Sequence, residues 1–156
     1  MNTRLFGALA ASTMLCGVAQ AAIGSVTFTG SVTSVCSLSV QNGAGTLAPS
    51  SNLSNLSSKN SGGVAGIVNL NTTGNVTLTV DPATSPIQPP TDVATTLWAP
   101  SYSLAGVQTV ADTNGLTSIA NPGTGAITVN LTATKAGGTA FHTGTYGATV
   151  TVRCEP

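Results

Sequence analysis

Apolar and polar residues mostly alternate along two stretches, one near each end of the chain. From residue 144 to residue 154 the apolar side chains occupy even positions: Tyr146, Ala148, Val150, Val152 and Cys154. From residue 24 to residue 40 the same parity holds, again with Ser and Thr between: Val26, Phe28, Gly30, Val32, Cys36, Leu38 and Val40. Side chains alternate between the faces of a strand, so each stretch predicts a β-strand with one apolar face. We expect both end strands to lie in one core and to pair or assemble through Val26, Phe28, Val32, Tyr146, Val150 and Val152.

The interior of the chain predicts further strands and no helix. Residues 64–70 and 75–80 are two apolar runs around the turn signal at 71–74, which predicts a hairpin. Residues 81–92 contain four prolines and predict a loop, and residues 102–110 form a weaker strand. Residues 126–134 alternate well, with these side chains inward: Ile127, Val129, Leu131 and Ala133. Turn signals recur about every ten to fifteen residues, which is typical of an all-β sandwich or barrel.

The first residues have the pattern of an export signal. Residues 5–18 are apolar and too short to span a membrane, and Ala19-Gln20-Ala21 is a small-x-small cleavage site. We therefore expect a signal peptide at residues 1–21 and a mature chain of one domain at residues 22–156. The mature chain has no second long apolar run, so it predicts an exported protein without a membrane span.

Charge is scarce throughout. The sequence has 4 Lys and Arg against 4 Asp and Glu, with a formal net charge of +0. A nucleic-acid surface needs clustered Lys and Arg, so we expect no nucleic-acid partner. A weakly charged surface rich in Ser, Thr and Asn repels its neighbours little, which suits a subunit that packs into an assembly.

Candidate chemistry is sparse. His142 is the single histidine and has no Ser, Cys or carboxylate partner beside it, which favours a solvated loop residue. The carboxylates of the mature chain are scattered, and its His and Cys residues are too few for a convincing zinc site. We expect no enzyme, no metal and no cofactor. Trp98 and Tyr102, next to the proline-rich loop, could form a sugar-stacking platform, although packing is the more common role for such residues.

Two cysteines remain after signal removal, Cys36 and Cys154. Export to an oxidising compartment predicts a disulfide between them. Two buried free thiols and an intermolecular bridge are the alternatives.

The two ends together resemble the chaperone–usher pilins and the related spore-coat-U-like secreted proteins. The start, Gly24-Ser25-Val26-Thr27-Phe28-Thr29-Gly30-Ser31-Val32 leading to Cys36, resembles the opening strand of such pilins, and residues 144–152 are similar to their closing strand. The resemblance implies an immunoglobulin-like antiparallel β-sandwich of about seven strands that lacks its final strand. A periplasmic chaperone covers the resulting groove, an outer-membrane usher assembles the subunits, and the next subunit's N-terminal extension then fills the groove.

The chain departs from that family pattern in three ways. The family has its second cysteine near the positions of Asn71 and Thr72, whereas this chain has Cys154. Only residues 22–25 precede the predicted first strand, which is short for a donor, and the C-terminus lacks the apolar tail that such chaperones grip. A bond from Cys36 to Cys154 would draw the first and last strands together, so we expect a groove that is at least partly closed and a self-sufficient fold.

The sequence therefore predicts a structural subunit of a cell-surface fibre or coat, assembled with like subunits by β-strand addition. The alternative is a monomeric secreted or periplasmic β-sandwich that binds carbohydrate or protein. Whether residues 22–32 fill the groove of their own chain or that of a neighbour stays open at this point.

Overall fold

The computed structural model describes residues 22–156, so the expected signal peptide at residues 1–21 lies outside the described residues. The chain divides into two units, residues 1–31 and residues 32–156. The described residues of the first unit, 22–31, are exposed and form neither helix nor strand. Within the described range, no helix is long and apolar enough to cross a membrane.

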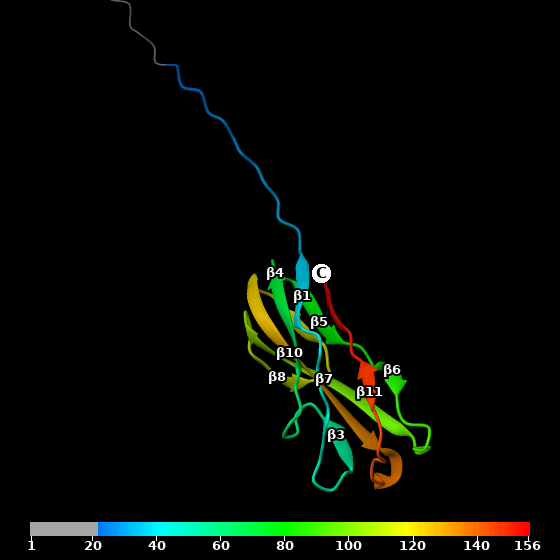
Figure 1. Ribbon diagram of the computed structural model, residues 1–156. Helices are drawn as coiled ribbons and strands as arrows, with labels where there is room; N and C mark the ends of the chain where they lie inside the picture. The colour runs from blue at the N-terminus through cyan, green and yellow to red at the C-terminus, as the bar shows by residue number, and fades with distance from the viewer. Residues whose placement is uncertain (1–21) are drawn as a thin grey trace, which may run out of the picture. The chain divides into compact units, whose positions relative to one another are not determined.

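The second unit contains twelve strands and one short 3₁₀ turn (Figure 1). In chain order the strands are β1 (Cys36–Asn42), β2 (Ala48–Pro49), β3 (Asn55–Ser57), β4 (Gly66–Thr72), β5 (Val76–Val80), β6 (Thr84–Ile87), β7 (Thr96–Gly106), β8 (Val110–Thr113), β9 (Thr117–Ile119), β10 (Gly123–Lys135), β11 (Gly147–Thr149) and β12 (Val152–Glu155). The 3₁₀ turn η1 (Ala136–Gly138) follows β10.

The strands form one large sheet and two small ones, and all their pairings are antiparallel. The large sheet is centred on β10, which pairs with β4 and β3 along one edge and with β7 along the other. At the margins of this sheet β1 pairs with β4, β2 with β3, and β8 with β7. The small sheets are β12-β5-β9 and β11-β6. The predicted all-β class is confirmed, although with more and shorter strands than the seven expected.

The core lies where the large sheet packs against the β12-β5-β9 sheet. Its buried cluster takes side chains from β4, β7 and β10 on one side and from β5 and β9 on the other: Leu70, Val76, Leu78, Tyr102, Leu104, Ile119 and Ile127. The Tyr102 hydroxyl donates to the carbonyl oxygens of Leu78 and Gly115 and bonds the hydroxyl of Thr117. The inward face predicted for residues 126–134 is confirmed, since Ile127 and Ala133 are completely buried.

The turn after β4 carries the chain from one sheet to the other, so the predicted hairpin of residues 64–80 is wrong. β4 pairs with β1 and β10, whereas β5 pairs with β9 and β12. The corner needs left-handed backbone at Gly74 (φ 88°) and Asn75 (φ 54°). A Cβ at Gly74 would also lie 2.5 Å from the carbonyl oxygen of Ala120, so this glycine permits a close approach of two backbones.

The first strand begins at Cys36, not at Gly24, and the prediction of a buried strand from residue 24 onward is wrong. Val26, Phe28 and Val32 are 78%, 91% and 84% exposed. Alternation identifies a segment that can form an amphipathic strand, but the strand also needs a neighbouring ladder to pair with. The chain thus keeps an exposed, alternating segment, residues 22–34, which we call the N-terminal segment.

Two prolines lie inside strands that sequence reading missed or shortened. Pro86 lies in β6, within the predicted loop, and β7 runs without a break through Trp98 and Pro100. Pro86 tolerates the missing N–H donor because β6 pairs only with β11 in the described sheets. Pro100 tolerates it because β8, the neighbour of β7 opposite β10, pairs with β7 only at Tyr102 and Leu104.

The core packing predicts that the same substitution, Leu→Ala, lowers the free energy of unfolding by different amounts at buried and exposed positions. Leu78 is completely buried, whereas Leu116 is 76% exposed. We expect Leu78→Ala to lower the free energy of unfolding by about 2–5 kcal/mol, and Leu116→Ala by less than about 0.5 kcal/mol. Urea unfolding followed by circular dichroism measures both, and similar losses for the two variants would contradict this core.

Candidate functional site

An apolar groove runs along the second unit between β1 and the chain at residues 146–152. Its volume is about 730 Å³. One wall carries Leu38 and Val40 of β1, and the floor is made by Val68 of β4 with Val129 and Leu131 of β10. The opposite wall is formed by consecutive residues of the last segment, Tyr146 to Val152.

Both walls of the groove are edges of sheets. β1 pairs with β4 alone, β11 with β6 alone, and β12 with β5 alone in the sheets of the described residues. Each edge therefore presents backbone N–H and C=O groups on its groove side, which is the geometry that accepts another strand. An edge that faces an apolar floor also offers burial to alternate side chains of an incoming strand.

The parity found in the sequence places the wall side chains. Leu38 is half-buried, and Val40 on the same face is 69% exposed because nothing covers it. On the other wall Tyr146, Val150 and Val152 are half-buried and line the groove. The structure thus brings these three predicted pairing residues to one site. The other three, Val26, Phe28 and Val32, are the exposed residues of the N-terminal segment.

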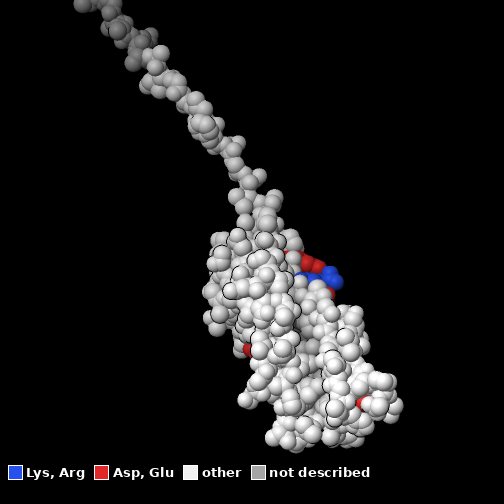
Figure 2. All heavy atoms as spheres, in the orientation of Figure 1, with Lys and Arg blue, Asp and Glu red and all other residues white. Residues whose placement is uncertain are grey.

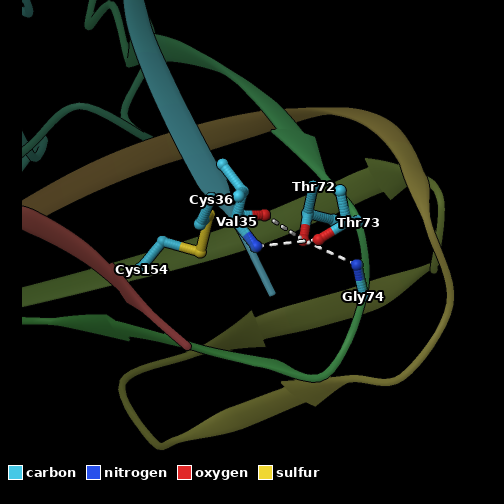
Figure 3. The surroundings of a disulfide bond; sticks show 6 residues. All are labelled: Val35, Cys36, Thr72, Thr73, Gly74 and Cys154. Carbon is cyan, nitrogen blue, oxygen red and sulfur yellow. Dashed lines mark hydrogen bonds between the residues drawn. A yellow bond between two sulfur atoms is a disulfide. The ribbon is translucent and has the colours of Figure 1, made fainter. Parts of the chain in front are cut away.

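The predicted disulfide is confirmed and ties the two walls together at one end (Figure 3). Cys36, the first residue of β1, is bonded to Cys154 of β12, at a sequence separation of 118 and with 6.0 Å between their Cα atoms. The two alternatives, free thiols and an intermolecular bridge, are absent from the described residues. Since the groove continues beyond this bond, the expectation of a partly closed groove holds at the disulfide end.

A buried ion pair lies where the last segment begins. Lys135 and Asp92 are 2.9 Å apart, with side chains that are 0% and 1% exposed. The Tyr146 hydroxyl donates to the same carboxylate, and the Lys135 ammonium also donates to the carbonyl oxygen of Ala94. The Lys135 ammonium lies over the Phe141 and Tyr146 rings, 5.1 Å and 5.4 Å from their centroids. This cluster joins the wall at Tyr146 to the end of β10.

The protonation behaviour of the cluster follows from its hydrogen bonds. Burial alone would raise the pKa of Asp92, but hydrogen bonds from Tyr146 and Lys135 outweigh burial and lower that pKa from 3.8 to about 2. Burial and the neighbouring Asp92 carboxylate together raise the pKa of Tyr146 to about 12. Sequence reading missed the ion pair, although Lys135 continues the inward parity of Ile127 and Ala133 along β10.

Tyr102 has the packing role that is more common for such residues and cannot take part in a sugar-stacking platform. Tyr102 is completely buried and its hydroxyl is fully engaged in the core, so its ring offers no face to a ligand. Trp98, four residues earlier on β7, is half-buried. His142 is exposed, as expected for a loop residue.

The charges of the second unit are nearly all consumed by ion pairs. Besides the buried pair, Lys59 contacts Asp112 and Arg153 contacts Asp81. Few charged atoms appear on the face in Figure 2, where blue and red atoms lie next to each other in one place and isolated red atoms lie elsewhere. Among residues 22–156, no group of three metal-ligating side chains comes together.

Comparison with protein-family models, with curated proteins and with solved structures finds no match for the chain. The features that bear on function are the groove, the disulfide and the N-terminal segment.

The buried ion pair predicts an acid-sensitive fold. The pKa of Asp92 is lower in the folded chain, about 2, than its ordinary value of 3.8. The ionised carboxylate thus stabilises the fold above pH 4, and this stabilisation is lost as the pH falls through about 2. In wild type the urea midpoint should drop over this window.

The substitution Asp92→Asn should lower stability at neutral pH, because it leaves the Lys135 ammonium buried without its partner. It should also flatten the drop between pH 4 and pH 2. The control Asp112→Asn, at an exposed pair, should keep most of that drop. An unchanged acid profile in Asp92→Asn would contradict the assignment.

Proposed function

We propose that the chain is an exported structural subunit of a cell-surface fibre or coat, assembled by β-strand addition. In this proposal the N-terminal segment of one copy lies in the apolar groove of the next copy. Like subunits are then the main partners, and the site of assembly is the groove between β1 and residues 146–152.

The proposal is supported most by two features of the same chain that complement each other: a groove that lacks a strand and a segment that lacks a sheet. The groove has apolar walls and unpaired sheet edges, and the N-terminal segment has apolar side chains at alternate positions and no ladder of its own. Burying Val26, Phe28 and Val32 would each contribute about 1.5–3 kcal/mol. The backbone groups of both edges would find partners in the same step.

The lengths of the two features agree. The wall from Tyr146 to Val152 has seven residues, as does the stretch from Val26 to Val32. Since β1 starts at Cys36, the N-terminal segment has 13 residues in place of the four expected before the first strand. A strand advances about 3.3 Å per residue, so these residues reach beyond the length of the wall.

The resemblance to chaperone–usher pilins supplies the assembly machinery of this proposal, a periplasmic chaperone and an outer-membrane usher. A disulfide is compatible with export through an oxidising compartment. The alternative, a monomeric carbohydrate-binding module, loses its platform with the burial of Tyr102. An enzymatic role has no support from the groove, whose lining is mostly apolar or hydroxylic.

A single charge on the inward face of the N-terminal segment should stop assembly. Phe28→Asp would place a carboxylate on the apolar floor of the groove, at a cost of several kcal/mol. Wild-type protein exported to an oxidising compartment should give a ladder on unheated gels that boiling collapses to monomer. The Phe28→Asp chain should run as monomer under both conditions.

The matched control is Thr27→Asp, one residue away on the opposite face of the predicted strand. It introduces the same carboxylate, pointing away from the floor, and should keep the ladder. Loss of the ladder in both variants, or in neither, would count against strand addition.

A further inference from the structure

A set of hydrogen bonds holds the chain where the last residues of the N-terminal segment join β1, and those of Val35 are drawn in Figure 3. The Thr73 hydroxyl accepts from the Val35 N–H at 2.7 Å and donates to the Thr33 carbonyl oxygen at 3.0 Å. The Thr72 hydroxyl donates to the Val35 carbonyl oxygen at 3.0 Å and accepts from the Gly74 N–H at the same distance. The Thr73 N–H donates to the Val35 carbonyl oxygen as well.

These contacts extend β1 backwards along the end of β4. Val35 continues the register in which Cys36 lies opposite Thr72, so residues 33–35 run on in the line of β1. We call this set of contacts, from Thr33 and Val35 to Thr72 and Thr73, the exit clamp. While the exit clamp is intact, the N-terminal segment can turn back into its own groove only by reversing before Thr33 and returning alongside residues 33–36.

The disulfide closes the place where such a reversal would enter. A strand between two others lies about 4.8 Å from each, so it needs about 10 Å between the flanking strands. At Cys36 and Cys154 the two walls are 6.0 Å apart from Cα to Cα and are joined covalently. A hairpin that returned beside Cys36 would have to pass through this bond.

We propose that the disulfide and the exit clamp together exclude the N-terminal segment from the groove of its own chain and so reserve the groove for the segment of a second copy. This inference rests on the proposed function. A second copy's segment is tethered to a different β1, so the disulfide does not restrict how it approaches the rest of the groove.

Exclusion of the N-terminal segment from its own groove changes how strongly that segment competes with an added strand. A tethered segment that could reach its own groove would act at an effective concentration in the millimolar range. It would weaken the binding of an added strand by about 10²–10⁴-fold. An excluded segment would not compete at all.

The test uses a labelled synthetic peptide with the sequence of residues 22–34 and two full-length mature chains at nanomolar concentration. One chain is wild type, and the other carries Phe28→Asp, which disables its own segment as a competitor. Phe28 is 91% exposed, so this change leaves the fold intact. We expect the two chains to bind the peptide with dissociation constants that agree within about threefold. The same peptide with Asp in place of Phe28 is the control and should not bind.

Each outcome separates the two proposals. If the Phe28→Asp chain binds at least tenfold tighter than wild type, the N-terminal segment reaches its own groove, and this inference is overturned while strand addition stands. If the peptide binds neither chain, strand addition is overturned and the inference goes with it.

The role of the disulfide is tested in the Cys36→Ser/Cys154→Ser background. There the wild-type segment should compete, and the chain with Phe28→Asp should bind the peptide more tightly than the chain without it. Equal affinities in this folded background would overturn the role given to the disulfide. If the double variant does not fold, the comparison between the two disulfide-bonded chains still decides whether the segment is excluded.

Discussion

One covalent constraint organises this molecule: the bond between Cys36 and Cys154. It joins an edge strand of the large sheet to an edge strand of a small sheet at one end, while the rest of both edges pairs with no other strand among residues 22–156. Without the bond, two sheets held mainly by the cluster around Leu78 and Tyr102 could slide or close at that margin. With it, the walls are fixed at one end and the groove keeps its shape. The buried contacts of Lys135 with Asp92 and of Asp92 with Tyr146 fix the wall at the opposite end.

The alternation of apolar and polar residues predicted much of the fold, because it shows which face of a strand is apolar. It placed Ile127 and Ala133 in the core and Val150 and Val152 on an inward wall, and the expected export together with the count of cysteines predicted the disulfide. The alternating pattern gave a wrong strand where no pairing partner is present, because the pattern does not show which neighbouring strand would pair with it. Val26 and Phe28 have the alternation of a core strand, yet they lie in an exposed segment, because no ladder in their own chain receives them.

The remaining errors have similarly local causes. The turn at Gly74 and Asn75 looks like a hairpin turn in sequence, but its two positive φ angles send β5 into the other sheet. The predicted strand of residues 126–134 ends before Lys135, because a charged side chain rarely occupies a core position without a partner. Its partner Asp92 lies 43 residues away, beyond any local pattern. Sequence reading therefore found the residues of the groove wall but not the ion pair that anchors it.

The disulfide also determines where mechanical force enters the fold. A pull on residues 22–32 passes through the exit clamp to Cys36, where the chain is held by hydrogen bonds to β4 and by a covalent bond to β12. Tension is thus shared at once between both layers, and β1 cannot be peeled from the large sheet without dragging the last strand with it. Under load, the two sheets are therefore sheared together, and the strands are not peeled away one at a time.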